Sequence, residues 1–440
     1  MTKAFEFPVT QNSVAATFTG WRSLAPRKEI CPHFAYDTNG GKDGQGTLII
    51  VADEREGLDG WWNKAFPVTG GGYYHFHLLY RAESVKAPRR SVVIKIDWFD
   101  AEGKAVPEDQ PTCTGYLPGY KSMAETEHPK AKETDSEGWT EVSHTYYVPS
   151  QATQASVELH LLWSPNSRIE WSLASLTQTA PPPKRVVRLA TVHFQPHGGE
   201  SPDGNCRLFE PFIAEAAKRR ADLVVLGETL TLYGTGKTYA DVAELIPGPS
   251  TEYFGALAKQ HDLYIVAGLV ERVGHLIYNT AVLMGPDGEV VGRYRKMCLP
   301  RTEVQSGVAP GSEYPVFDTR FGKVGMMICY DGFFPEVALE LTRKGAEVIA
   351  WPVWGCNPLL ASARACENHV YVVSSTYEDI SRNWALSAVY NHEGKTIALA
   401  TEWGTVAVAE VDLEEPTRWL CLGDFKAHLH RHRPLAPDEL

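Results

Sequence analysis

Cys329 is the residue of this sequence best placed to act as a nucleophile. It comes directly after the short apolar run 324–328, which predicts a strand buried on both faces, and Pro335 then marks the first turn of a helix. A cysteine between a strand and a helix N-terminus lies where α/β sheets bind ligands and where the helix dipole favours a thiolate. The same position also fits a cysteine that packs as a small hydrophobe, so its chemistry depends on its neighbours.

Three charged residues end other predicted elements of the same region. Glu228 follows the apolar run 221–226, Lys296 follows a turn and a short strand, and Glu303 comes seven residues after Lys296. Taken singly, each fits an ordinary solvated charge, because Glu and Lys side chains are mostly exposed.

Taken together, these residue types supply the parts of an acyl-transfer site. A cysteine needs a base or a cation to become a good nucleophile near neutral pH, and Glu228 can take its proton. Lys296 can stabilise the thiolate and, with the backbone N–H of Tyr330, the oxyanion that forms when sulfur attacks a carbonyl or nitrile carbon. Glu303 can hold Lys296 or the attacking water in place. We therefore expect hydrolysis through a thioester on Cys329.

The region from residue 186 to about 425 resembles the nitrilase, or carbon-nitrogen hydrolase, superfamily. The resemblance is carried by three motifs, which are Tyr-Arg-Lys before Leu-Pro at 294–300, Cys-Tyr-Asp at 329–331 after Val-Gly-Met-Met-Ile, and Ala-Arg-Ala-Cys-Glu-Asn at 363–368. It implies a Glu228, Lys296, Cys329 triad supported by Glu303.

The same resemblance implies a four-layer αββα fold for this region and a homo-oligomer, a dimer or larger. One departure from the family pattern is Gly227, which stands where proline commonly precedes the first glutamate.

The elements that must position these residues follow the pattern of an α/β domain. Nearly continuous apolar strands alternate with helices, which is typical of a layered fold with a largely parallel sheet. The predicted strands are 186–192, 221–226, 263–270 and 279–284, and the predicted helices are 207–220 and 251–261.

Residues 1–178 have a different texture and predict an all-β sandwich or jelly roll. Short alternating strands, among them 47–51, 73–80, 91–98 and 155–163, are separated by turn residues, and 107–137 is a polar stretch expected to be a long loop. This region resembles the galactose-binding-like jelly rolls of carbohydrate-binding modules. A Pro-rich linker at 179–185 separates it from the hydrolase-like region 186–425, and residues 426–440 are expected to form a tail.

Three aromatic residues near the predicted strand ends are candidates for substrate binding. Tyr233 lies just beyond Glu228 in a loop that only partly matches a phosphate-binding motif, and Trp354 and Trp384 follow strands on the same sheet edge as Cys329. Each tryptophan fits core packing as well. The histidine-rich run 428–433 lacks a defined ligand geometry and is expected to be a terminal arm.

Composition narrows the classes of partner. The chain has 440 residues, 43% hydrophobic and 22% charged, with a net charge of −12, which argues against a nucleic-acid or anionic-membrane partner. No window is long and apolar enough for a signal peptide or a membrane span, so we expect a soluble, cytoplasmic protein. The eight scattered cysteines contain no Cys-x-x-Cys pair, so neither disulfides nor a zinc site is expected. We expect no cofactor.

The sequence thus predicts an amidase that releases ammonia from a small carboxamide. The triad itself does not distinguish carboxamides from N-carbamoyl compounds or nitriles. An acyltransferase that uses the same thioester, and a carbohydrate-binding protein with an inactive hydrolase domain, remain as alternatives.

Overall fold

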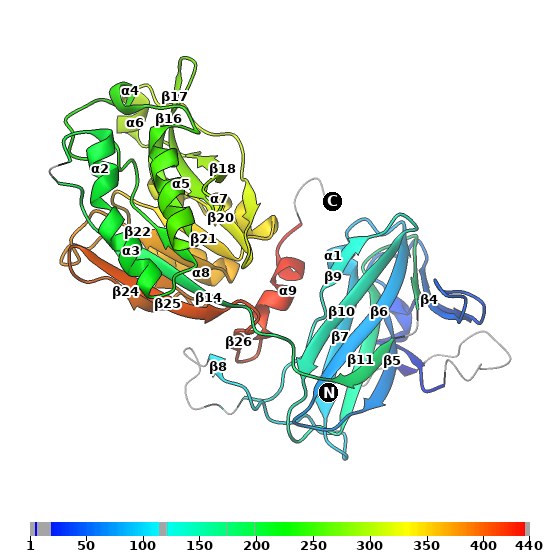
Figure 1. Cartoon of the computed structure of the whole chain (residues 1–440). Helices are drawn as coiled ribbons and strands as arrows, with labels where there is room; N and C mark the ends of the chain where they lie inside the picture. The colour runs from blue at the N-terminus through cyan, green and yellow to red at the C-terminus, as the bar shows by residue number, and fades with distance from the viewer. Residues whose placement is uncertain are drawn as a thin grey trace. The chain divides into compact units, whose positions relative to one another are not determined.

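The computed structural model describes residues 5–6, 19–113, 120, 122–172, 174–197 and 199–435, and the chain forms two compact units (Figure 1). Unit 1 comprises Met1–Pro183 together with Pro416–Leu440, and unit 2 comprises Lys184–Glu415. The division at Pro183 falls inside the Pro-rich segment. The sequence-based division ended the hydrolase-like region at 425 and began a tail at 426. In the structure the boundary lies earlier, because the chain groups with unit 1 from Pro416 onwards.

Two antiparallel sheets enclose the core of unit 1, which contains Trp62, Phe76 and Trp171. The first has the strand order β1 (Phe5–Glu6), β2 (Arg22–Ala25), β5 (Asp59–Pro67), β11 (Gln154–Leu162) and β7 (Val92–Phe99). The second has the order β3 (His33–Asp37), β4 (Thr47–Ala52), β12 (Ser167–Trp171), β6 (Tyr73–Glu83), β10 (Trp139–Tyr147) and β9 (Ala131–Thr134), and β13 (Ser175–Thr179) also pairs with β6.

The four strands named from the sequence of this region are confirmed as β4, β6, β7 and β11. The long loop predicted over 107–137 is wrong in part, because Ala131–Thr134 forms β9 and pairs with β10. The short helices of this part are η2 (Lys28–Ile30) and α1 (Pro88–Ser91).

The C-terminal segment is built into unit 1. Strands β26 (Arg418–Trp419) and β27 (Gly423–Asp424) form a small sheet with β8 (Thr112–Cys113), and α9 (Phe425–His432) follows. The histidine-rich run 428–433, which we expected to form a terminal arm, therefore lies largely on α9. Among the described residues, no group of three or more His, Cys, Asp or Glu side chains is arranged to hold a metal ion.

Unit 2 contains two six-stranded sheets. One has the order β18 (Val290–Arg295), β17 (Leu276–Met284), β16 (Tyr264–Val273), β15 (Leu223–Val225), β14 (Val186–His193) and β25 (Thr405–Asp412). The other has the order β19 (Val316–Asp318), β20 (Lys323–Met326), β21 (Val348–Pro352), β22 (Tyr371–Ser375), β23 (Ala388–Tyr390) and β24 (Thr396–Leu399). Each has a parallel centre, formed by β14, β15 and β16 in one sheet and by β20, β21 and β22 in the other.

The helices of unit 2 contact both sheets. Helices α3 (Glu210–Lys218) and α5 (Pro249–His261) contact the first sheet, and α7 (Pro335–Arg343) and α8 (Leu359–Asn368) contact the second. The sheets contact each other through strands such as β14 and β22. The remaining helices are α2 (Pro202–Leu208), α4 (Tyr239–Val242), α6 (Arg301–Gln305) and η3 (Cys329–Phe333).

The single helix predicted over 207–220 is wrong, because the chain forms α2 and α3 instead. Pro211 lies in the first turn of α3, where its missing N–H costs nothing, whereas it would break a helix that continued through it. Within the ranges described above, none of the helices combines the length and apolar character that a membrane crossing requires.

Candidate active site

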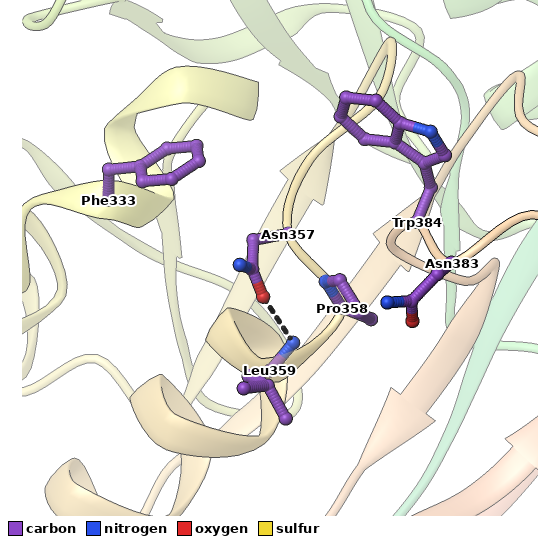
Figure 2. A pocket seen from close by; sticks show the side chains of 6 residues that line it. All are labelled: Phe333, Asn357, Pro358, Leu359, Asn383 and Trp384. Atoms are coloured by element: carbon purple, nitrogen blue, oxygen red, sulfur yellow. Dashed lines mark hydrogen bonds between the residues drawn. The ribbon is translucent and has the colours of Figure 1, made fainter.

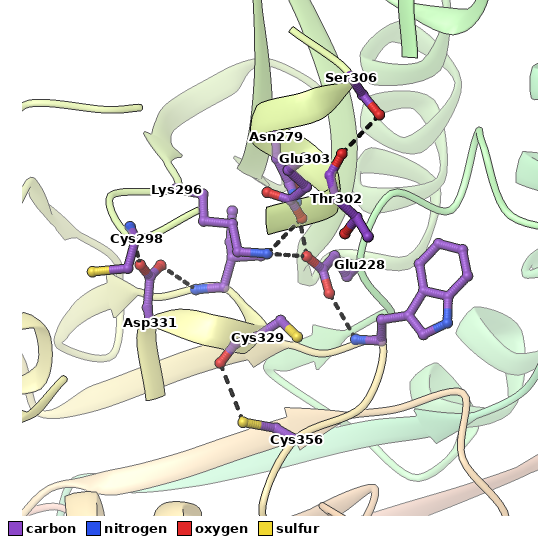
Figure 3. A network of polar contacts seen from close by, with 12 residues as sticks. Glu228, Asn279, Lys296, Cys298, Thr302, Glu303, Ser306, Cys329, Asp331 and Cys356 are labelled. Carbon is purple, nitrogen blue, oxygen red and sulfur yellow. Dashed lines mark hydrogen bonds and ion pairs between the residues drawn. The ribbon is translucent and has the colours of Figure 1, made fainter. Parts of the chain in front are cut away.

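A buried lysine between two carboxylates lies at the centre of the site. The Nζ of Lys296 is 2.7 Å from Glu228 Oε1 and 2.7 Å from Glu303 Oε1 (Figure 3). Only 1% of Lys296 is exposed, so its charge depends on these carboxylates rather than on water. Three of the four residues identified from the sequence therefore meet in one ion-pair network.

The network is completed by groups that hold the two carboxylates still. Asn279 Nδ2 donates to Glu228 Oε1 at 2.7 Å and to Glu303 Oε1 at 3.0 Å. The backbone N–H of Trp354 donates to Glu228 Oε2 at 2.7 Å. Glu303 Oε2 is buried and lacks a hydrogen-bond partner among the described residues, so it remains able to accept a bond from a water or a ligand.

Cys329 begins the turn η3, shortly after the end of β20 at Met326, and its side chain lies with Lys296 and Glu228 in Figure 3. Its φ of 38° lies in the left-handed region, which non-glycine residues avoid except where the surroundings enforce it, often at functional sites. The thiol donates to Gly355 O at 3.3 Å. The carbonyl of Cys329 accepts from Trp351 Nε1 at 3.3 Å and from Cys356 Sγ at 3.5 Å. The strained turn is thus fastened to the loop after β21.

Asp331 fixes this turn relative to the segment that carries Lys296. One carboxylate oxygen accepts from the backbone N–H of Ile328 at 2.9 Å and from Tyr294 O–H at 2.8 Å, and the other accepts from the backbone N–H of Cys298 at 2.8 Å. Burial raises the pKa of Asp331 to about 6, although these backbone donors favour its charged form. Asp331 therefore links the turn that carries Cys329 to the segment that carries Lys296.

The electrostatic environment favours a protonated cysteine in the resting site. Burial and the charge of Glu228 raise the pKa of Cys329 well above its usual value, and the opposing effect of Lys296 is smaller. At a thiol that is 9% exposed, burial opposes the thiolate that the helix dipole favours. Proton removal must therefore accompany attack.

The pKa values of Lys296 and Glu303 are both raised, but for opposite reasons. Burial alone would lower the pKa of Lys296, but the charges of Glu228 and Glu303 outweigh it and raise the pKa. Burial raises the pKa of Glu303, against the effect of Lys296. Lys296 therefore remains a cation throughout the neutral pH range.

Gly227, the departure from the family pattern, is explained by Tyr377. A Cβ at position 227 would lie 2.4 Å from two ring carbons of Tyr377, which is closer than real contacts allow. Gly268 plays a similar part, since a Cβ there would lie 2.6 Å from the Cα of Glu228. Glycine at position 227 thus leaves room for the buried ring of Tyr377, and Glu228 still lies inside the network.

Two of the three aromatic candidates pack against each other, and one of them, Trp354, also donates its backbone N–H to Glu228. The ring centroids of Tyr233 and Trp354 are 4.8 Å apart, and Tyr377 packs against both. Trp384 lies apart from this cluster and lines a cavity with Phe333 and Asn357 (Figure 2). Trp351 is fully buried and packs in the core. Tyr330 is the second residue of η3, which places its backbone next to Cys329.

Sequence reasoning missed the residues that support the charges. Asn279 was identified only as part of a strand, and a lone amide in such a strand carries no signal of its own. Gly355 and Cys356 contact the Cys329 turn from a loop that follows a different strand. The available signal was their position shortly after β21, since this strand is parallel to β20 and ends at the same edge of the sheet.

Comparison with known proteins agrees with the resemblance noted in the sequence. The family model of carbon-nitrogen hydrolases matches residues 188–419. A protein named nitrilase from Pyrococcus abyssi (strain GE5 / Orsay) is 38% identical over 243 residues, which cover 52% of this chain and 90% of the relative. An omega-amidase NIT2 from Xenopus tropicalis is 34% identical over 250 residues, which cover 52% and 89% of the two chains.

Among solved structures, Saccharomyces cerevisiae Nit3, described as a member of branch 10 of the nitrilase superfamily, is 28% identical. It covers 52% of this chain and 90% of its own, with a TM-score of 0.47. Because the family model spans half of the chain and the two relatives are covered almost completely, this chain is a hydrolase enzyme and belongs to the carbon-nitrogen hydrolase family.

Proposed function

We propose that this hydrolase is an amidase, which converts a small carboxamide into a carboxylic acid and ammonia through a thioester on Cys329. The observation that carries the proposal is the buried network in which Lys296 lies between Glu228 and Glu303, next to a cysteine on a strained turn. A nucleophile, a base and a fixed cation within one water-poor site are what acyl transfer requires.

In the first step the sulfur of Cys329 attacks the carbonyl carbon while Glu228 takes the thiol proton. The raised pKa of Cys329 makes this coupled transfer necessary. The carbonyl oxygen becomes an oxyanion, and we assign its stabilisation to Lys296 and the backbone N–H of Tyr330. Asn279 and Glu303 keep Lys296 and Glu228 oriented, so little reorganisation is needed as charge develops.

The intermediate then collapses, the carbon-nitrogen bond breaks, and Glu228 gives its proton to the departing nitrogen, which leaves as ammonia. A water molecule attacks the thioester carbon and passes a proton to Glu228. The carbon-sulfur bond breaks, the acid leaves, and the proton on Glu228 returns to the sulfur. The unpartnered Oε2 of Glu303 is the group on the protein best suited to hold that water or the substrate nitrogen.

The preference for a carboxamide is supported by the names of relatives. Several of the similar proteins are omega-amidases, and another is named nitrilase. N-carbamoyl compounds and nitriles would use the same nucleophile and cation, so they are the alternatives to include in a test.

The test is a panel of carboxamides, N-carbamoyl compounds and nitriles with ammonia release as the measurement. We expect ammonia from at least one carboxamide, with none from the Cys329→Ala variant. Preferred release from a nitrile or an N-carbamoyl compound would replace the amidase assignment, and product formation only when an amine is added would indicate an acyltransferase. Absence of ammonia over the whole panel, with binding on a glycan array, would favour the carbohydrate-binding alternative.

The proposal extends to the finer architecture and the partners. We infer a four-layer αββα arrangement for unit 2, supported by helices on both of its contacting sheets. We infer a galactose-binding-like jelly roll for unit 1, supported by its two antiparallel sheets around one core. We also propose that the protein assembles into a homo-oligomer and that it is cytoplasmic. Its proposed partner is a small-molecule substrate, with no nucleic-acid or membrane partner.

A further inference from the structure

A cavity of about 370 Å³ opens in unit 2 beside the Cys329 turn. Its walls come from three segments, namely η3, the loop that leads into α8, and the loop between β22 and β23. Phe333 and Trp384 stand on opposite sides of it in Figure 2. The lining residues are Phe333, Asn357, Pro358, Leu359, Asn383 and Trp384. A volume of this size is sufficient for a small ligand.

All three walls are tied to the backbone of Cys329. Phe333 ends the turn that Cys329 begins. Asn357 follows Cys356, whose thiol donates to Cys329 O at 3.5 Å. The third wall is joined through the backbone N–H of Ala385, which donates to Cys356 O at 2.7 Å. The segments that form the cavity are therefore linked to the turn that carries the nucleophile, although Cys329 itself does not line the cavity.

The lining is neutral and rich in apolar surface. The two polar side chains in it are the amides of Asn357 and Asn383, and Asn357 Oδ1 already accepts from the backbone N–H of Leu359 at 3.0 Å. None of the six lining residues, all of them described, carries a charge. A carboxylate or ammonium group brought against these walls would find no ion-pair partner among the lining residues.

The cations nearest to the walls in the sequence are engaged elsewhere. Arg382, next to Asn383, contacts Glu378 at 3.4 Å and is 67% exposed. Arg364 is buried and donates to Gly332 O at 3.1 Å while it pairs with Glu367 at 2.7 Å. The recognition that this wall offers is therefore apolar and aromatic contact.

We propose that this cavity is the acyl-chain subsite, and that the substrate is an uncharged carboxamide whose acyl chain ends in an aromatic or branched aliphatic group. The proposal rests on the amidase function proposed above. Phe333 and Trp384 hold the chain end between them, and the uncharged wall disfavours amides with a second, ionised carboxyl group.

The test compares kcat/KM for three amides. Acetamide has no acyl chain beyond its methyl group, 3-phenylpropanamide carries an aromatic group at the end of its chain, and succinamic acid carries an ionised carboxylate there. We expect 3-phenylpropanamide to exceed succinamic acid by about tenfold or more, and Trp384→Ala to lower kcat/KM for 3-phenylpropanamide by about tenfold while changing that for acetamide by less than about twofold. Leu359→Lys should raise kcat/KM for succinamic acid about two- to fivefold.

Trp403→Ala is the matched control, because Trp403 is exposed to the same degree as Trp384, 42% against 43%, but does not line the cavity. It should leave the order of the three amides unchanged. Succinamic acid as the best substrate, or an equal effect of Trp384→Ala on acetamide and 3-phenylpropanamide, would overturn the subsite while leaving the amidase function in place. No hydrolysis of any carboxamide would overturn both.

Discussion

Each unit of this protein buries a cation among carboxylates, and the two clusters differ in what surrounds them. In unit 2, Lys296 lies between Glu228 and Glu303. In unit 1, Arg418 is 2.8 Å from Glu127 and 3.6 Å from Glu108, and only 6% of its side chain is exposed. Burial of charge alone therefore does not identify a catalytic site.

The difference lies in the neighbours and in the origin of the parts. The cluster of unit 2 has a cysteine on a strained turn beside it, and its charges come from the segments after β15 and β18 and from α6. The cluster of unit 1 takes its arginine from the C-terminal segment, which pairs through β26 with β8. We infer that the first cluster serves chemistry and the second fastens the end of the chain to unit 1.

Removing the arginine should give the largest effect on stability. Arg418→Met leaves buried carboxylates without their cation, so we expect the free energy of unfolding of unit 1 to fall by about 3–5 kcal/mol. Hydrogen exchange of the backbone amides of β10 and β11 measures this free energy of unfolding. Lys132→Met, which removes an exposed lysine paired with Glu141, should cost less than about 1 kcal/mol. A large loss of kcat/KM in folded Arg418→Met protein would contradict the division of roles.

Removing the lysine should instead act on the rate. We expect Lys296→Met to lower kcat/KM about 100- to 1000-fold, because the oxyanion loses its cation. The amide that releases ammonia fastest is the substrate for this assay, and thermal unfolding checks that the variant is folded. Lys395→Met removes an exposed lysine and should be neutral. Activity within about threefold of the parent would contradict the role of Lys296.

The pH dependence of unit 1 offers a finer comparison. Burial raises the pKa of Glu127 to about 7, and Arg418 opposes this only in part. Because the folded-state pKa is raised, the stability contributed by protonated Glu127 is fully present below about 4.5 and is lost as the pH rises through about 7. As the pH rises from about 4.5 to about 7, the free energy of unfolding of Glu127→Gln should therefore increase relative to that of the parent, by about 3 kcal/mol at most.

The difference between the two proteins at each pH is the quantity to measure, since the buried His128, whose pKa burial lowers to about 2, titrates with the opposite sign in both. A difference that stays constant between pH 4.5 and 7 would mean that Glu127 does not change its protonation in the folded state.

The smallest expected effect concerns the position of Glu228. Gly227→Ala would place a Cβ against Tyr377, and overpacking of this kind costs about 1–3 kcal/mol. Adding Tyr377→Ala should recover part of that loss. A double-mutant cycle on the free energy of unfolding and on kcat/KM measures the coupling, and additive effects would show that the ring and the glycine are independent.

Glu228, Lys296 and Cys329 could be predicted from the sequence because each lies just after a predicted element. Glu228 after an apolar run and Cys329 before a proline-initiated helix are local patterns. Asn279 could not be found in this way, because an amide within an apolar strand has no local signature and its role depends on two carboxylates brought from other segments.

The fold shows the same limit. Strands such as β4 and β14 follow from alternation or continuous apolar runs, whereas the attachment of 416–435 to unit 1 depends on pairing between residues about 300 positions apart, as in Arg418 with Gln110. Pro211 is a local signal for the break between α2 and α3, but the helical pattern of 207–220 outweighed it in the prediction.

The most direct test of the account is the mass of the Cys329 peptide during turnover. The enzyme is quenched in acid while it hydrolyses the carboxamide that releases ammonia fastest, and its peptides are analysed by mass spectrometry. The account predicts that the acyl group of that substrate is attached to Cys329 and that Cys329→Ala carries neither the adduct nor the activity. An acyl group on another residue, or full activity in Cys329→Ala, would contradict it.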